Sequence, residues 1–256
     1  MRIRESVAIV SGANRGLGRS FVDALIARGA TKVYAGARNI EDLAPLLAEH
    51  GDKVVALPFD VTLDADVIDA AKQASDVTLV INNAGVLESS GVLQAGSIEP
   101  LQREMDVNVF GLARLTLAFA PVLGNNGGGA VLNVLSAASL VAFPPFGSYS
   151  ATKAAAMSLT HSLAHELQSQ NTSVHGLYAG FIDTGMISYV DAEKASPADI
   201  VAAGLDGVEA EILNIDADER AKSVRIALRD DPEGLIKSSW NRADEFRKSH
   251  PPKKPD

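Results

Sequence analysis

The sequence predicts an α/β fold in which a doubly wound parallel sheet is covered by helices on both faces. Apolar runs of four to seven residues alternate with segments of helical periodicity along most of the chain. These runs are continuously apolar, as expected for strands that are buried on both faces because helices cover each side. Strict alternation of strand and helix then implies parallel strands joined by right-handed crossovers.

The expected elements follow in order along the chain. Each expected strand is rich in Val, Ile and Leu, and each expected helix has one apolar stripe. We expect strands at 6–12, 32–37, 53–58, 77–85, 129–136 and 173–180, and helices at 17–28, 40–49, 64–75, 99–123 and 149–169.

The pattern loosens after Gly185. Residues 185–200 are expected to form a substrate loop that becomes helical after Pro197, where the fixed proline φ suits a first helical turn. A short last strand is expected at 210–215, followed by a helical region with a break near Pro232. No internal repeat or long linker divides the chain. We therefore expect one domain over residues 1–246, with 247–256 as a disordered tail of prolines and charges.

Composition excludes several classes of protein. With 256 residues and 46% hydrophobic residues, the chain can bury a full core. Its net charge of −9 argues against a nucleic-acid partner, and the absence of cysteine excludes disulfides and thiolate sites. The N-terminus has no apolar segment of signal-peptide length, and the most apolar helical segment, 112–124, is too short to span a bilayer and contains Arg114. We expect a cytoplasmic protein with no membrane partner.

A glycine-rich turn joins the first expected strand to the first expected helix. The segment SGANRGLGRS places Gly12, Gly16 and Gly18 with the spacing G-x-x-x-G-x-G. Glycine there permits a tight turn, close approach of the backbone to a pyrophosphate, and tight contact between helix and strand. The first N–H groups of the helix have no partner within it and carry the positive end of the helix dipole, so an anion fits there. In this position the three glycines predict a dinucleotide-binding loop.

Two arginines bear on the choice of dinucleotide. Where a unit binds NAD, an acidic residue about 20 positions further on takes the ribose hydroxyls, whereas an arginine accommodates a 2′-phosphate. Here Arg38 lies 20 residues after Gly18, and Arg15 lies within the glycine loop itself. Guanidinium groups bind phosphate through charge-assisted, often bidentate hydrogen bonds. The pair favours NADP(H).

Tyr149 and Lys153 lie four residues apart at the start of an alanine-rich helix, in the segment FGSYSATKAAAMSL. Residues i and i+4 share one face of a helix. In one interpretation both are surface residues of an amphipathic helix. In the other, the lysine cation, together with the positive charge of an oxidised nicotinamide, favours the phenolate and lowers the tyrosine pKa from about 10, which makes the phenol an acid–base catalyst.

Further motifs stand in order along the chain and identify a family. The landmarks are Gly12-x-x-x-Gly16-x-Gly18, Asp60-Val61, Asn82-Asn83-Ala84-Gly85, Asn108, Ser136 and Tyr149-x-x-x-Lys153. Over residues 7–185 the chain resembles the short-chain dehydrogenases/reductases, in particular their NADP-preferring main branch. The resemblance implies a Rossmann-like fold, NADP(H) as cofactor, a small carbonyl or alcohol substrate, and a homodimer or homotetramer.

The resemblance assigns the reaction to four side chains. Tyr149 would be the general acid in carbonyl reduction and the base in alcohol oxidation, and Lys153 would also hold the nicotinamide ribose. Ser136, 13 residues before Tyr149, would hydrogen-bond the substrate carbonyl, while Ser139 is assigned to the loop or pocket. Asn108 would hold a water that connects the lysine to solvent.

The resemblance also implies a set of cofactor-binding residues. Asp60 would face the adenine, and Ile182 and Thr184 would meet the nicotinamide carboxamide. Of Asn82 and Asn83, one would tie strands together and the other would touch the cofactor, and the sequence leaves open which. The full set is Gly12, Asn14, Arg15, Gly16, Leu17, Gly18, Arg38, Asp60, Val61, Asn82, Asn83, Ala84, Gly85, Tyr149, Lys153, Ile182 and Thr184.

The chain departs from the family pattern at three places. Ala179 stands where proline is usual, and Ser11 stands where threonine is commoner. The glycine-rich ending that helps many members to form a tetramer is also missing, which puts the tetramer in doubt.

Two other features leave alternatives open or carry no chemistry. Phe143, Pro144, Pro145 and Phe146, with Met186 and Tyr189, form either an apolar substrate wall or simple loop packing. His161 and His165 lack a third ligand at a recognisable spacing, so we predict no metal site.

The function expected from these observations is reduction of an aldehyde or ketone with NADPH. The first alternative is an NADP-dependent alcohol dehydrogenase working in the oxidative direction. The second is a non-catalytic NADPH-binding sensor or scaffold, which has no need of the acid–base set.

Overall fold

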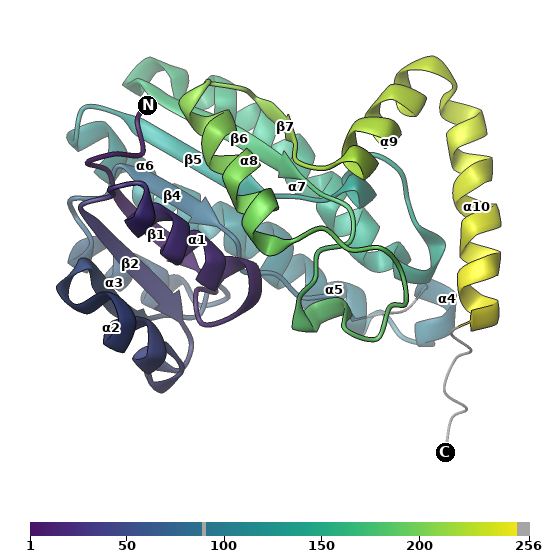
Figure 1. Cartoon of the computed structure of the whole chain (residues 1–256), viewed down its shortest axis with the longest axis horizontal. Coiled ribbons are helices and arrows are strands. Elements are labelled where there is room, and N and C mark those ends of the chain that lie inside the picture. Colours follow the sequence, from purple (N-terminus) through teal and green to yellow (C-terminus); the bar gives the residue numbers. More distant parts are fainter. Residues whose placement is uncertain (89–90, 250–256) are drawn as a thin grey trace.

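A single parallel sheet lies between two layers of helices in the computed structural model, which describes residues 1–88 and 91–249 (Figure 1). The strand order β3-β2-β1-β4-β5-β6-β7 confirms the predicted doubly wound fold. The strands are β1 (Val7–Ser11), β2 (Lys32–Ala37), β3 (Val54–Pro58), β4 (Leu79–Asn82), β5 (Gly129–Val134), β6 (Thr172–Tyr178) and β7 (Asn214–Asp216). The helices are α1 (Gly16–Ala27), α2 (Ala44–His50), α3 (Asp64–Gln73), α4 (Val92–Ala95), α5 (Glu99–Met105), α6 (Leu112–Asn125), α7 (Gly147–Glu166), α8 (Pro197–Glu209), α9 (Glu219–Asp230) and α10 (Pro232–Ser249).

The core has two halves because successive strand residues point to opposite faces of the sheet. Ala8 and Val10 of β1 pack with α1, α2 and α8, whereas Ile9 packs on the other face with α3, α6 and the end of α7. All three strand residues are fully buried. The continuous apolar runs of the sequence thus reflect a sheet covered on both sides.

The strand order reverses between β1 and β4, which lie side by side in the centre of the sheet. In open α/β sheets, ligands bind at such a switch point, in the crevice beyond the carboxyl ends of the strands. β1 ends at Ser11 and β4 at Asn82, so the glycine loop and the Asn82–Asn83 pair emerge together at this edge.

The predicted helix over 99–123 is interrupted by a π-helical turn. α5 passes into residues Asp106–Gly111, which form π-type bonds, before α6 begins. Such turns contain one extra residue and occur often at functional sites. Asn108 lies inside the turn, consistent with its poor helix propensity.

Two helices complete the chain after β7. Figure 1 shows α9 and α10 together at the end of the molecule opposite α2. α10 packs against α9 and against the short 3₁₀ turn Pro144–Phe146, which precedes α7. The C-terminal helices therefore stand beside the segment that leads to Tyr149.

Several predicted boundaries are shifted. The 40–49 segment is a 3₁₀ turn followed by α2, and the last strand covers Asn214–Asp216 rather than 210–215. Helix α8 begins at Pro197 as predicted, and the break near Pro232 separates α9 from α10. α10 runs to Ser249, three residues into the predicted tail, because its apolar face packs on the protein. Residues 250–256 lie outside the described part of the chain.

One helical stretch in the described residues, Glu99–Asn125, is long and apolar enough to cross a membrane by length and composition. Leu115, Phe119 and Leu123 of this stretch are fully buried against the sheet and α3. We therefore interpret it as a core helix, whose apolar residues face the inside of the protein.

Candidate active site

The glycine loop has the backbone geometry that its sequence predicts. Gly12 and Gly16 have φ angles of +66° and +53°, a region that residues other than glycine rarely adopt. At Gly18 a Cβ would lie 2.1 Å from the Gly12 carbonyl oxygen, so only glycine lets α1 start this close to the loop. A Cβ at Gly16 would lie 3.5 Å from Thr184 Cγ2, in the narrow gap across to the loop after β6. The loop thus keeps an open path for a pyrophosphate.

Polar side chains fix the loop to β4. The Ser11 hydroxyl accepts hydrogen bonds from the backbone N–H of Asn83 at 3.1 Å and of Ala84 at 3.0 Å. In return, Asn83 Nδ2 donates to the carbonyl oxygens of Ser11 at 2.9 Å and Gly12 at 3.2 Å. Serine at position 11 keeps the hydroxyl that these contacts need.

The structure separates the roles of the two asparagines. Asn82 is buried and donates to Asn133 Oδ1 at 2.8 Å and to Thr116 Oγ1 at 3.1 Å, which ties β4 to β5 and α6. Asn83 lines the cleft described below. Asn82 is therefore the residue that ties strands together, and Asn83 is the one in reach of a ligand.

The two predicted arginines lie at the same end of the cleft. Arg15 and Arg38 are both exposed there, and neither forms an ion pair within the described residues. Asp60 also lines this end, and its Oδ1 accepts from the Thr62 N–H and hydroxyl, both at 2.8 Å. Asp42 lines it too, where it accepts from Asn14 Nδ2 at 3.4 Å. Two uncompensated cations are thus available to an anionic group.

Tyr149 and Lys153 share the first turns of α7, which faces the cleft. The Lys153 ammonium lies 5.6 Å from the centre of the Tyr149 ring and donates a hydrogen bond of 2.8 Å to the Val134 carbonyl oxygen at the end of β5. Lys153 is only 5% exposed. The surface interpretation of this pair is therefore wrong: the lysine is held inside the protein beside the phenol.

Burial shifts the pKa of both groups. Burial raises the pKa of Tyr149 above its ordinary value, Glu104 raises it further, and a hydrogen bond with Ser136 lowers it. Burial lowers the pKa of Lys153 to about 8. Desolvation of the phenolate outweighs the favourable contact with Ser136, so the net direction is upward. The predicted lowering includes the positive charge of the oxidised nicotinamide and stays a prediction.

The two serines after β5 have different surroundings. Ser136 lines the cleft, and its hydroxyl accepts from the Ala138 N–H at 3.1 Å. Ser139 is buried, and its hydroxyl accepts from the Ser136 N–H at 3.2 Å in a capping box. Ser139 therefore holds the turn, and Ser136 is the serine that a ligand can reach.

Asn108 fastens the π-helical turn to the strand edge. Its Oδ1 accepts from the Val86 N–H at 2.8 Å, and its Nδ2 donates to the Val86 carbonyl at 3.0 Å and to Thr152 Oγ1 at 3.0 Å. A small cavity of about 10 Å³ lies between Asn108, Asn82 and Lys153. That is about the space one water needs, and the site offers polar partners.

A single cleft of about 970 Å³ joins these groups, within the size range of ligand pockets. Of the predicted site residues, those that line it are Gly12, Asn14, Arg15, Gly16, Leu17, Gly18, Arg38, Asp60, Val61, Asn83, Ala84, Gly85, Ser136, Tyr149, Lys153, Ile182 and Thr184. Asn82 and Asn108 lie behind the wall, at the small cavity. Phe143, Phe146 and Met186 of the predicted apolar wall also line the cleft, whereas Pro144, Pro145 and Tyr189 do not.

Comparison with known proteins identifies this arrangement. A model of the short chain dehydrogenases matches residues 6–195. The chain belongs to the short-chain dehydrogenase/reductase family. This dehydrogenase is therefore an NAD(P)-dependent oxidoreductase, as its glycine loop and Tyr149–Lys153 pair predict.

Individual relatives are similar over most of the dehydrogenase. A short chain dehydrogenase from Burkholderia cenocepacia J2315, solved in complex with NADP, is 38% identical with a TM-score of 0.89, covering 93% of this chain and 99% of that one. The 3-oxoacyl-[acyl-carrier-protein] reductase of Synechocystis sp. is 30% identical over 195 residues, 73% of this chain and 78% of the relative. The 2-(R)-hydroxypropyl-CoM dehydrogenase of Xanthobacter autotrophicus is 33% identical over 193 residues, 72% of this chain and 77% of the relative.

Sequence reasoning missed three charged residues at the site. Glu104 is fully buried, and its Oε1 accepts from the Glu88 N–H at 2.8 Å. Arg220 and Arg242, from α9 and α10, line the cleft. No spacing rule marks the two arginines, because their position depends on how the C-terminal helices fold back.

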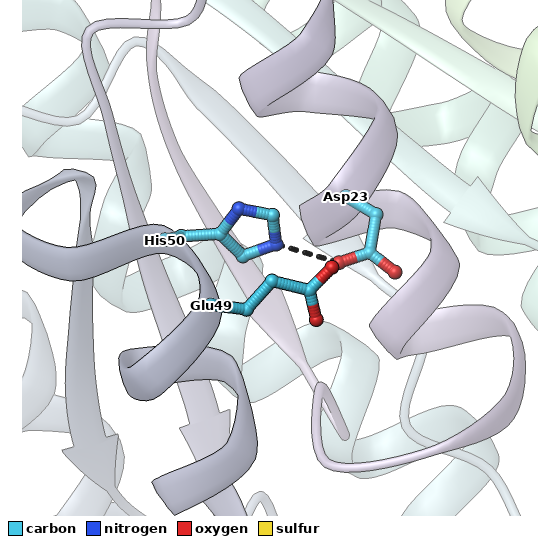
Figure 2. Close-up of side chains that lie close together, drawn as sticks. All are labelled: Asp23, Glu49 and His50. Atoms are coloured by element: carbon cyan, nitrogen blue, oxygen red, sulfur yellow. Dashed lines mark hydrogen bonds and ion pairs between the residues drawn. The ribbon is translucent and has the colours of Figure 1, made fainter.

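A histidine and two carboxylates also gather away from the cleft, between α1 and α2. Figure 2 shows Asp23, Glu49 and His50 together, with a 2.7 Å contact between His50 Nε2 and Asp23 Oδ1. Arg19 pairs with Glu49 and lies 3.7 Å from Asp23. Because the arginine already compensates both carboxylates, we interpret the cluster as an ion-pair network that joins the two helices.

Proposed function

We propose that this dehydrogenase is an NADP(H)-dependent reductase of aldehydes or ketones. The observation that carries the proposal is the convergence of Ser136, Tyr149 and Lys153 on the cleft that begins at the glycine loop.

The proposed reaction uses four side chains. When bound, NADPH supplies the hydride, and the glycine loop, Lys153 and Thr184 would hold it. The Ser136 hydroxyl donates a hydrogen bond to the substrate carbonyl oxygen and stabilises the negative charge that develops there. Tyr149 donates its proton to the same oxygen as the carbon is reduced.

The phenolate then needs a new proton. The Lys153 ammonium beside the ring is the proposed source, and the cavity between Lys153 and Asn108 is the proposed place for a connecting water. Three hydrogen bonds with Val86 and Thr152 fix the Asn108 side chain beside this cavity, which supports its proposed role.

The test is NADPH consumption in the presence of a panel of aldehydes, ketones and diketones, with NADH in parallel. Turnover with NADPH that depends on Tyr149 supports the proposal. Turnover only from alcohols with NADP⁺ supports the oxidative alternative. Cofactor binding without turnover of any carbonyl or alcohol supports the sensor or scaffold. The predicted cytoplasmic location and homo-oligomer stay predictions.

The cofactor choice leads to a first prediction. Arg38→Asp removes one phosphate partner and supplies an acid for the ribose hydroxyls, so kcat/KM with NADPH should fall about a hundredfold while that with NADH rises. Arg15→Met should lower only the NADPH value, by about tenfold or more. Steady-state kinetics with both cofactors measures the effect. Arg19→Met, outside the cleft, is the control, and an unchanged NADPH preference in Arg38→Asp contradicts the proposed role.

The low pKa of Lys153 leads to a second prediction. Reduction needs the protonated lysine, and deprotonation begins as the pH rises through about 8. We expect kcat/KM for carbonyl reduction to be flat below this pH and to fall about tenfold per pH unit above it. A pH profile at saturating NADPH measures this. A rate that stays flat to about pH 10, where an ordinary lysine titrates, contradicts the relay through Lys153.

A further inference from the structure

Two arginines from the C-terminal helices line the cleft beyond the catalytic tyrosine. Arg220 lies in the first turn of α9 and Arg242 lies in α10. Both side chains are exposed, so a ligand in the cleft can reach them. Neither takes part in an ion pair within the described residues.

The backbone around Gly180 places Arg220. Asp218 caps α9, accepting from the Ala221 N–H at 2.7 Å, and its other oxygen accepts from the Gly180 N–H at 2.7 Å. A Cβ at Gly180 would lie 2.5 Å from Arg220 Cδ, so the arginine occupies the space that this glycine leaves. Its guanidinium lies 4.5 Å from the centre of the Phe181 ring. Arg220 is thus held beside the loop that also carries Ile182 and Thr184.

Contacts of α10 place Arg242. The Ser239 hydroxyl, one helical turn before Arg242, donates a hydrogen bond of 2.6 Å to the Ala142 carbonyl oxygen, in the segment before Tyr149. Ala243 is buried, and the Phe246 ring packs edge-on against Phe143 at 5.5 Å between ring centres. These contacts fix α10 on both sides of Arg242.

Among residues 1–88 and 91–249, no carboxylate forms an ion pair with Arg220 or Arg242. The pKa of Arg220 is lowered mainly by burial and then by the Arg242 charge, and only Asp218 opposes this. The Arg220 side chain is exposed, yet the protein groups around its guanidinium remove enough water to lower its pKa. Both Asp218 oxygens already accept backbone N–H groups. Glu88, which also lines the cleft, is paired with Arg103 at 2.9 Å. Two like charges held together in a protein of net charge −9 indicate a place for an anion.

These arginines come from other elements than the pair assigned to the 2′-phosphate. Arg15 belongs to the loop between β1 and α1 and Arg38 follows β2, whereas α9 and α10 lie at the end of the molecule opposite α2 (Figure 1). The lining of the cleft that holds the C-terminal arginines and Tyr149 also includes apolar groups, among them Phe143, Phe146 and Val224. A ligand that fills this end needs an apolar body and an anionic terminus.

We propose that Arg220 and Arg242 bind an oxoanion group, above all a carboxylate, at the far end of an apolar carbonyl substrate whose carbonyl lies at Ser136 and Tyr149. This inference rests on the proposed reductase function and specifies its substrate class. The guanidinium pair would form charge-assisted hydrogen bonds with the anion.

The first test compares a chain-length series of ω-aldehyde carboxylates with their methyl esters as substrates for NADPH oxidation. Wild-type enzyme should prefer the acid of suitable length over its ester by about tenfold to a hundredfold in kcat/KM. Arg220→Met and Arg242→Met should bring this ratio close to one, mainly through KM for the acid, while ester reduction continues. Arg220→Lys should retain part of the preference. Arg229→Met and Arg247→Met, on the same two helices but outside the cleft, are the matched controls.

The second test measures binding without turnover. Isothermal titration of hexanoate and hexanamide into the protein, with and without NADP⁺, should show tighter binding of the carboxylate and loss of that difference in both arginine variants. Equal binding of hexanoate and hexanamide to wild-type protein overturns the proposal. A double variant, Arg220→Met with Arg242→Met, that still binds hexanoate more tightly than hexanamide overturns it too. If esters are reduced but acids have no advantage, the substrate class is wrong and the reductase stands. If carboxylate binds through the arginines but no carbonyl turns over, the reductase function fails and the anion site stands.

Discussion

Tyr149→Phe will lower kcat for carbonyl reduction by about a thousandfold, because it removes the proposed proton donor without changing the shape of the ring. NADPH affinity should stay within about twofold of wild type, since the glycine loop and the arginines are untouched. Stopped-flow or steady-state NADPH oxidation measures the rate, and fluorescence titration measures the affinity.

Tyr34→Phe provides the matched control for this loss. The Tyr34 hydroxyl bonds to Asp76 at 2.9 Å, and Tyr34 does not line the cleft, so removal of this second phenol should leave kcat unchanged. A Tyr149→Phe enzyme that retains more than about a tenth of wild-type kcat would refute the role of Tyr149 as general acid.

Gly18→Ala will strongly weaken NADPH binding and lower the melting temperature. The added methyl group would lie 2.1 Å from the Gly12 carbonyl oxygen and 2.6 Å from Asn83 Nδ2, so the start of α1 must move away from the loop. Overpacking of this kind costs about 1–3 kcal/mol or more, which corresponds to a shift of roughly 5 °C in a chain of this size. We expect affinity for NADPH to fall at least about a hundredfold, because the displaced N–H groups no longer face the pyrophosphate.

Gly124→Ala is the control for the glycine substitution. Its added methyl group would meet only the end of the Gln170 side chain, at 3.4 Å, and alanine is favoured in a helix. Calorimetry of both variants measures the loss of stability, and titration with NADPH measures the loss of affinity. Wild-type NADPH affinity in Gly18→Ala would show that the contact between loop and helix does not position the phosphate site.

The sequence predicted those parts of the molecule that local rules determine. Continuous apolar runs predicted the strands, because each lies between two helical layers. The glycine spacing predicted the loop at the switch point, and the four-residue interval predicted that Tyr149 and Lys153 share a face of α7. The choice of Ser136 over Ser139 agrees with the buried capping role of Ser139.

Other features depend on tertiary contacts that no local pattern encodes. The interval between Tyr149 and Lys153 carries no information on desolvation, which raises the pKa of Tyr149. Asn108 was expected to be unusual in its helix, but its three side-chain bonds require the π-helical turn and the approach of Val86. Arg220 and Arg242 enter the cleft only because α9 and α10 return to the loops after β5 and β6.

The position of β1 in the middle of the sheet relates the order of synthesis to the order of assembly. The first strand to leave the ribosome is the one against which β2 and β4 pair, so the sheet can grow outward in both directions as translation proceeds. The cofactor loop belongs to this early centre, whereas α9 and α10 are added last, at the far end. Under the proposed anion site, changes in these last-made helices would alter the substrate that is accepted without touching the central strands.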